Sequence, residues 1–403
     1  MRGHVFVVDR FSWPVHRSRL FCGVKNPMNI NSRLSLYADL LCVREGDLVF
    51  FYQRRINEPR WERGFRGVFR AINPPGAIRP PFFDDENLSW ENNEVLGKCP
   101  YCGNPYSEKQ GRCPICEEQL DPTKHILPNR VLIRPDEEHG YFEKPVDDNT
   151  AYINHTNHGM LWTMLFRKIF GPGRERSVTP ILPEEVEKLI RLLRRVNNYE
   201  TSTFPTNPYS PSTLHRISIN LCDFKEGNRV RYENALMAWM TENIDKDYPV
   251  LRDIVGPLDE LEYFGNNVLY GIGGEKVDLL LLHKRNGVRY RATVIELKRD
   301  KIGRRAIDQI EDYSYWIAQL STANLTPPPE RFELQPVLIG HGITSEVPTL
   351  IERIQERVIT IPYQPPCKVR VHRPIVVIYS IIDCEINFEI KEDLSKGSLL
   401  AYL

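Results

Sequence analysis

The chain contains the stretch KVDLLLLHKRNGVRYRATVIELKR, from Lys276 to Arg299, in which two apolar runs flank Asn286–Gly287. An Asn-Gly pair favours the tight turn of a β-hairpin, so the two runs are predicted to be antiparallel strands. Because strand side chains alternate between faces, Glu296 and Lys298 point to the same side. The hairpin also returns Asp278 to within about one residue of Glu296. Two carboxylates and a lysine are therefore expected at one strand end.

Both flanks of this hairpin are predicted to be helical. Asn228 to Ile244 reads as a helix that exposes Glu233. Its broad apolar side carries Val230, Leu236, Met237, Met240 and Ile244. Ala306 to Leu320 reads as a second helix, in which Gln309 and Tyr313 lie four residues apart and hence on one face.

This order of elements resembles the PD-(D/E)XK nuclease superfamily. The residues that carry the resemblance lie within 228–403 and are Glu233, Asp278, Glu296, Lys298, Gln309 and Tyr313. The sequence departs from the superfamily pattern at Val277, which stands in place of a proline that many members also lack. The resemblance implies a restriction-endonuclease-like mixed sheet flanked by helices over 228–403. It also implies an Mg²⁺-dependent endodeoxyribonuclease, a hydrolase of phosphodiesters, in which Mn²⁺ is the alternative ion.

The chemistry of these groups agrees with the implied roles. Asp278, Glu296 and the backbone carbonyl of Leu297 offer the hard oxygen ligands that Mg²⁺ prefers, and such an ion lowers the pKa of a bound water. Lys298 would orient that water or offset charge on the transition state. Three further side chains would support the ion, the lysine or the phosphate backbone: Glu233, Gln309 and Tyr313. The alternative is an ordinary sheet edge, because such residues also meet by chance.

Length and composition predict a multi-domain α+β or α/β protein. The 403 residues are enough for two or three domains with their own cores, and 41% are hydrophobic. Lys+Arg and Asp+Glu are balanced at 53 each, so any nucleic-acid surface must be local. The best candidate is the basic run from Lys284 to Arg305, which includes Arg299 as a DNA contact. For Arg289 and Arg291 a solvated sheet edge is the alternative.

The chain is predicted to be cytoplasmic, since no apolar run reaches about 18 residues and no signal-peptide core is visible at the N-terminus. Nine cysteines are present, of which four form two Cys-x-x-Cys pairs. The other five are scattered without a framework, which fits a reducing compartment. They are Cys22, Cys42, Cys222, Cys367 and Cys384.

Residues 1–198 resemble the EVE/PUA-like domain family. The resemblance is carried by four short motifs: CGVKN at 22–26, GDLVFFY at 46–52, GVFR at 67–70, and RSVTPI at 176–181 before an acidic helix start at Pro183. It implies a small β-barrel with helices that holds a modified or flipped base. The candidate pocket residues are Trp13, Asn26, Tyr52 and Trp61, with Arg174 and Arg176 as phosphate contacts. Trp and Tyr side chains in a barrel are, however, more often core residues.

Residues 97–120 are predicted to be a zinc ribbon inserted in this domain. Cys99-Pro-Tyr-Cys102 and Cys113-Pro-Ile-Cys116 have the spacing of two knuckles that bind one tetrahedral Zn²⁺. Four thiolates make a closed, structural site. A redox Cys-x-x-Cys is the rival interpretation.

The polar, Pro-rich segment from Asn197 to Ser212 is predicted to open a linker over 199–227, ahead of the nuclease domain at 228–403. The remaining elements expected there are a strand at 336–340, a helix at 348–358 and an apolar strand at 374–382.

Together these features resemble a modification-dependent restriction endonuclease, a defence enzyme in which a base reader delivers a nuclease to DNA. A single active site cuts one strand, so cutting both would require a homodimer or two binding events. The alternatives are a repair nuclease that reads mismatched or branched DNA, and a nucleic-acid-binding module that does not cut. RNA remains an open substrate.

Overall fold

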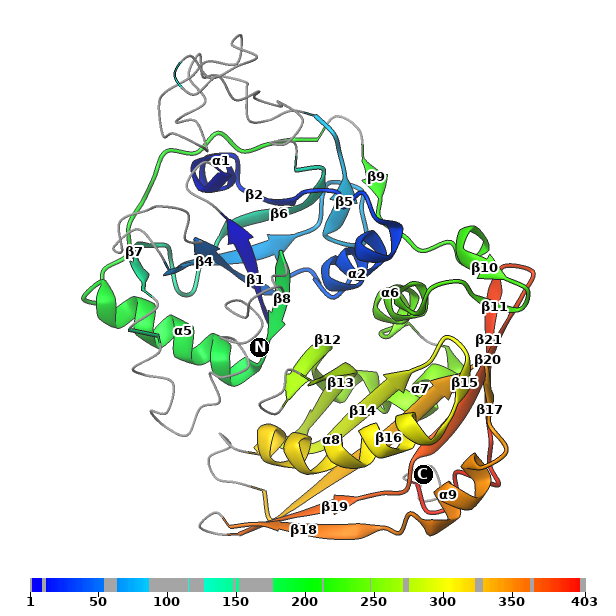
Figure 1. Cartoon of the computed structure of the whole chain (residues 1–403). Helices are drawn as coiled ribbons and strands as arrows, with labels where there is room; N and C mark the ends of the chain where they lie inside the picture. The colour runs from blue at the N-terminus through cyan, green and yellow to red at the C-terminus, as the bar shows by residue number, and fades with distance from the viewer. Residues whose placement is uncertain are drawn as a thin grey trace.

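The computed structural model describes residues 2–8, 12–53, 64–86, 115, 127–147, 150–151, 177–211, 214–246, 248–270, 275–322, 329–362 and 366–398. Over these residues the chain is mixed α+β, and it forms two lobes that each contain a β-sheet (Figure 1). The predicted multi-domain α+β class is confirmed at this level.

The N-terminal lobe is built on a nine-stranded sheet with the order β8-β1-β3-β4-β6-β5-β9, to which β2 and β7 add by pairing with β6 and β4. Its strands are β1 (Gly3–Val8), β2 (Phe21–Val24), β3 (Leu48–Gln53), β4 (Gly64–Ile72), β5 (Pro81–Phe83), β6 (Asn129–Pro135), β7 (Phe142–Val146), β8 (Val178–Ile181) and β9 (His215–Arg216).

The described helices of this lobe are α1 (Ser12–Arg19), α2 (Ile30–Leu40) and α5 (Pro183–Val196). The last begins at Pro183, where the sequence predicts a helix start. Pro183 occupies its first turn, and the side chain of Glu185 accepts a hydrogen bond from the Leu182 backbone N–H at 3.0 Å. Arg194 and Arg195 complement the helix dipole in its last turn.

The C-terminal lobe is built on an eight-stranded sheet with the order β12-β13-β14-β16-β19-β18, to which β20 adds by pairing with β16 and β21. Its strands are β12 (Leu261–Tyr270), β13 (Glu275–Arg285), β14 (Val288–Leu297), β16 (Arg331–Gly340), β18 (Arg357–Ile361), β19 (Cys367–Val371), β20 (Ile375–Ile382) and β21 (Glu385–Ile390). The short strands β15 (Lys301–Ile302) and β17 (Gly342–Ile343) pair separately.

Helices cover this sheet: α6 (Glu233–Asn243), α7 (Pro249–Val255), α8 (Arg304–Thr322) and α9 (Val347–Arg353). Two predicted helices are shorter than expected. The first begins only at Glu233, because β10 (Lys225–Glu226) and β11 (Arg229–Val230) form a small hairpin before it. The helix expected at 348–358 ends at Arg353, since the residues from Arg357 pair as β18.

The predicted linker packs against other parts of the chain. Within 199–227, Phe204 packs its ring 4.6 Å from that of Tyr141, and the Asn207 N–H donates to the Ser18 carbonyl at 2.8 Å. Further along, His215 and Arg216 of β9 pair with β5. The part of this segment up to Arg216 therefore packs on the N-terminal lobe, whereas Ile219 and Cys222 bond to Glu242 and Cys384 of the C-terminal lobe.

Polar contacts join the two lobes. Asp245, just beyond α6, accepts hydrogen bonds from Arg44 at 2.8 Å and from Arg79 at 2.7 Å. Asn266 on β12 donates to Asp39 on α2 at 2.7 Å. Both lobes also contribute to one continuous hydrophobic core cluster, so they are packed together.

Two arginines of the basic run belong to the interior. Arg289 is 3% exposed and pairs with Glu184 of the other lobe at 2.6 Å and with Glu262 at 2.8 Å. Arg291 is also 3% exposed. The prediction of a solvated edge is wrong for both, and neither side chain is displayed to a phosphate backbone.

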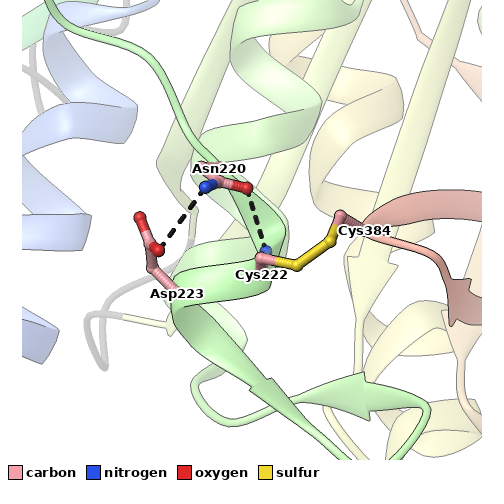
Figure 2. The surroundings of a disulfide bond; sticks show 4 residues. All are labelled: Asn220, Cys222, Asp223 and Cys384. Carbon is pink, nitrogen blue, oxygen red and sulfur yellow. Dashed lines mark hydrogen bonds between the residues drawn. A yellow bond between two sulfur atoms is a disulfide. The ribbon is translucent and has the colours of Figure 1, made fainter.

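Two of the cysteines predicted to be unpaired form a disulfide. Cys222 lies in the short helix η4 (Leu221–Phe224) and bonds to Cys384, with the two Cα atoms 4.9 Å apart (Figure 2). The interpretation of Cys222 and Cys384 as scattered thiols is therefore wrong. Cys22, Cys42 and Cys367 are buried and are not part of this disulfide. No helix in the described ranges is long and apolar enough to cross a membrane.

Candidate active site

The β13–β14 hairpin positions the carboxylates as the sequence predicts. Asn286 and Gly287 adopt φ of 50° and 80°, the left-handed pair that a tight two-residue turn needs. Along the ladder, Leu279 is opposite Ile295 and Leu280 is opposite Val294. One further step in the same register brings Asp278 opposite Glu296 at the end of the hairpin.

Hydrogen bonds tie this strand end together. The Leu297 backbone N–H donates to Oδ2 of Asp278 at 2.8 Å. Glu296 accepts two side-chain bonds, one from Nζ of Lys298 at 2.5 Å and one from the Tyr313 hydroxyl on α8 at 3.0 Å. The structure therefore brings four of the predicted catalytic residues into one cluster, which we call the carboxylate edge: Asp278, Glu296, Lys298 and Tyr313.

The carboxylate edge is buried and carries surplus negative charge. Asp278 is 7% exposed and Glu296 is 3% exposed. Burial, followed by the neighbouring Glu296 carboxylate, raises the pKa of Asp278 to about 8. Burial also raises the pKa of Glu296, although Lys298 and Tyr313 act in the opposite direction. Burial alone would lower the pKa of Lys298, but the Glu296 carboxylate and its neighbours raise it, so the lysine stays charged.

Glu233 stands at the start of α6, beside the same edge. Its Oε2 accepts a hydrogen bond from the Arg299 backbone N–H at 3.0 Å. Its charge also contributes to raising the pKa of Asp278 and of Glu296. Glu233 therefore supports the backbone that follows Lys298 and adds negative charge to the carboxylate edge.

Gln309 is not joined to the edge in the way that Tyr313 is. Both lie on α8, but Oε1 of Gln309 is buried and has no hydrogen-bond partner among the residues described. Of the two α8 residues predicted to have a positioning role, Tyr313 contacts Glu296 directly, and no such contact is seen for Gln309 among the residues described.

A residue that the sequence analysis missed completes the support of this edge. Tyr379 on β20 is fully buried, and its hydroxyl donates to the Arg299 carbonyl at 2.6 Å. The Arg299 peptide is thus held at its N–H by Glu233 and at its C=O by Tyr379. No local pattern marks Tyr379, which lies in an apolar strand, so only the tertiary structure reveals it. The Arg299 side chain pairs with Asp300 and Glu226.

Three of the candidate base-pocket residues, Trp13, Asn26 and Tyr52, are described and lie in the N-terminal lobe. Trp13, on α1, is 6% exposed and packs 5.1 Å from the Phe51 ring, while Tyr52, at 2% exposure, packs 5.0 Å from that of Phe65. A base could stack on either ring only if a neighbour moved. Asn26 is half-buried, and its Oδ1 has no hydrogen-bond partner in the described ranges.

Several predicted site residues fall outside the described residues. They are Cys99, Cys102, Cys113 and Cys116 of the predicted zinc ribbon, and Trp61, Arg174 and Arg176 of the predicted base reader. Their roles remain predictions.

Comparisons with known proteins do not name a family. No family model matches the chain, and no curated protein matches it. Among solved structures, a hypothetical protein from Leishmania major is 12% identical with a TM-score of 0.29, covering 49% of this chain and 96% of its own. A protein from Pseudomonas putida is 14% identical with a TM-score of 0.27, covering 47% and 99%. Human THYN1 in complex with 5-methylcytosine-containing DNA is 13% identical with a TM-score of 0.27, covering 48% and 98%. At these values the matches assign neither a family nor a function.

Proposed function

We propose that the chain is a metal-dependent DNA endonuclease in which the N-terminal lobe recognises a modified or flipped base. The observation that carries the proposal is the carboxylate edge, where Asp278 and Glu296 meet Lys298 at one end of the β13–β14 hairpin. A buried pair of carboxylates with a retained ammonium has little structural benefit, since each buried charge costs free energy. Such a set of perturbed groups is typical of a functional site.

The residues fit a divalent cation of the Mg²⁺ class. Carboxylate oxygens are its preferred ligands, and the repulsion that raises the pKa of Asp278 would be relieved by a positive ion. Asp278 and Glu296 would hold the ion. When bound, it would supply an activated water and polarise the phosphate.

The chain's own groups define the rest of the mechanism. Glu296 holds Nζ of Lys298 at 2.5 Å, which keeps the lysine charged beside the carboxylates. The ammonium would orient the water and offset charge that develops on the phosphate oxygens. Tyr313 fixes the second oxygen of Glu296, and Glu233 fixes the backbone that follows Lys298.

For the N-terminal lobe we propose an EVE/PUA-like reader. The support is the mixed sheet of the lobe and the buried, unpartnered Oδ1 of Asn26 among the described residues, which is a suitable acceptor for a base edge. We further propose that a structural Zn²⁺ is bound by Cys99, Cys102, Cys113 and Cys116.

Cleavage of defined duplexes tests the proposal. Unmodified DNA and DNA containing 5-methylcytosine or 5-hydroxymethylcytosine are incubated with Mg²⁺ or Mn²⁺ and with the native chain, Lys298→Ala or Asp278→Ala. Lys391→Ala, a lysine paired with Glu389 on the surface of the C-terminal lobe, is the matched control. We expect cutting of modified DNA by the native chain and the control, and none by the other two variants.

The other outcomes separate the two halves of the proposal. Equal cutting of all duplexes would support the nuclease activity and would exclude recognition of the modification by the N-terminal lobe. DNA binding without cutting by the native chain would make the protein a binding module, and undiminished cutting by Lys298→Ala would exclude the proposed site.

A further inference from the structure

The Cys222–Cys384 disulfide lies on the surface, at the end of a hairpin of the C-terminal sheet. Both cysteines are exposed, and the bond joins positions 162 residues apart in the sequence (Figure 2). Cys384 belongs to the two-residue turn between β20 and β21. Asn220 fixes the other side, since its side chain accepts a hydrogen bond from the Cys222 N–H at 3.1 Å.

The conformation of the turn does not favour a cysteine. Asp383 and Cys384 have φ of 47° and 70°, in the left-handed region that favours glycine and asparagine. The β13–β14 hairpin makes the same kind of turn with Asn286 and Gly287. Cys384 thus occupies a glycine position in the β20–β21 turn, so local backbone preference does not account for it, whereas its sulfur bond does.

The disulfide fastens a segment that borders the carboxylate edge. From Cys222 the chain runs through β10 and β11 to α6, where Glu233 begins the helix. Within this border segment, residues 222–232, the Asn228 carbonyl accepts from the Ile381 N–H at 2.8 Å. The Val230 N–H donates to the Tyr379 hydroxyl at 3.4 Å.

The border segment also contacts the loop that follows Lys298. The Arg299 guanidinium donates to the Arg231 carbonyl at 3.1 Å, and Arg229 pairs with Asp300. These contacts surround the Arg299 peptide that Glu233 and Tyr379 hold. Greater motion of the border segment would therefore also increase the motion of Glu233 and of the backbone of the carboxylate edge.

We propose that Cys222–Cys384 is a reversible redox site that fastens the border segment beside the carboxylate edge. A dithiol reductant donates two electrons and two protons, so that the S–S bond breaks, both cysteines become thiols and the dithiol becomes a disulfide. The exchange needs an accessible sulfur, which both exposed cysteines provide. In the reduced form the border segment is held only by its hydrogen bonds, its ion pairs and the packing of Val230 and its apolar neighbours against the core. The local inference goes beyond the proposed function, whereas its effect on DNA cutting rests on that function.

Hydrogen exchange tests the local effect without reference to cutting. The full chain is compared with and without dithiothreitol, and the Val230, Arg231 and Ile381 amides are monitored. We expect their exchange to rise by about tenfold or more on reduction, and the Ile295 amide within the β13–β14 ladder to remain unchanged. Thiol titration of the unfolded, oxidised chain in a chelator should find two fewer thiols than the nine cysteines of the sequence.

Two variants provide the controls. Cys222→Ser removes the bond with a side chain of similar size, and Cys384→Gly removes it while giving the turn a residue that suits its φ. Both should exchange at the reduced rate, and their border segment should not respond to dithiothreitol, which separates this effect from that of any other cysteine.

The outcomes distinguish this inference from the nuclease proposal. The redox site is supported if reduction speeds exchange of the border-segment amides in the native chain and not in the two cysteine variants. This holds whether or not DNA is cut. A parallel loss of cutting extends it to the active site. Nine free thiols in the protein from an oxidising buffer, or exchange rates that do not change on reduction, would overturn it.

Discussion

Asp245 joins the two lobes and Asp278 lies on the carboxylate edge, and the surroundings of these two aspartates shift their pKa values in opposite directions. Burial disfavours the charged form of Asp245, but hydrogen bonds from Arg79 and Arg44 hold the pKa of this carboxyl well below its usual range. For Asp278, burial and the Glu296 carboxylate act in the same direction and raise its pKa to about 8. The charge of Asp245 is balanced by two arginines of the chain, whereas Asp278 has surplus negative charge around it.

This difference separates a structural contact from a candidate functional site. Asp245 joins the lobes through two arginines and requires nothing from outside. The negative charges of Glu296 and Glu233 raise the pKa of Asp278, and the positive charge of Lys298 lowers it. A bound cation would balance the carboxylate edge, and the folded protein would then gain both stability and chemistry from it.

The largest effect is expected on cutting. Lys298→Ala and Asp278→Asn should each lower the cleavage rate by at least about a thousandfold, because the ammonium and the ion both act where charge develops in the reaction. Single-turnover cleavage measures this, and a binding assay without metal should show DNA affinity within about threefold of the native chain. Equal losses of binding and of cutting would instead indicate a docking role for these residues.

The next largest effect is expected at Asp245, as a loss of folding stability. Asp245→Asn leaves the guanidinium of Arg44, whose side chain is 6% exposed, without its charged partner. We expect the free energy of unfolding to fall by about 3 kcal/mol. Urea denaturation gives the value, and Asp253→Asn, at an exposed position on α7, should stay within about 0.5 kcal/mol. A fall no larger than that of the control would show that the contact does not stabilise the junction.

The pH dependence of stability sharpens the contrast further. In the metal-free protein the pKa of Asp278 is raised, so between about pH 5 and 8 the folded state holds a proton that the unfolded chain releases. Stability from this group is therefore complete below the unfolded pKa and is lost as pH rises toward 8. Each unit of pKa difference is worth about 1.4 kcal/mol, so we expect the free energy of unfolding to fall by about that amount for each pH unit between pH 5 and 8. Thermal unfolding in a chelator, from pH 5 to 8.5, measures it.

Asp278→Asn is the control for this titration. The amide oxygen can still accept from the Leu297 N–H but cannot ionise, so the variant should be more stable than the native chain at pH 8 without metal. Mg²⁺ should raise the melting temperature of the native chain and leave that of the variant unchanged. Parallel pH profiles of the two proteins would contradict the assignment of the raised pKa to Asp278.

Much of the carboxylate edge could be predicted because its information is local. Asn286 and Gly287 specify the turn, and alternation then sets the faces of Asp278 and Glu296. The same holds for α5, whose start is marked by Pro183 and by acidic residues in its first turn. Where turn and periodicity agree, the structure follows the sequence closely, and the ladder departs from a regular register only between His283 and Lys284.

Other features depend on contacts between distant residues and could not be predicted. The strand β12 contains Gly265, Asn266 and Asn267, which indicate a loop locally, yet Asn266 is fully buried and donates to Asp39 of the other lobe. The pairing of Cys222 with Cys384 spans 162 residues, and connectivity is not contained in spacing. In the interior, Trp13 and Tyr52 could be assigned to core or pocket only once their packing was known.

The smallest expected effect concerns Tyr313, which tests how the chain restrains the surplus charge of the edge. Its hydroxyl donates to Oε2 of Glu296 and lowers the pKa of that carboxyl. Tyr313→Phe should cost about 1 kcal/mol of stability and about tenfold in cleavage rate. Because Glu296 then ionises less readily, the rising limb of the pH–rate profile should also move to higher pH. A merely structural tyrosine would lower stability without moving that limb, so the profile decides between support of the fold and tuning of the carboxylate.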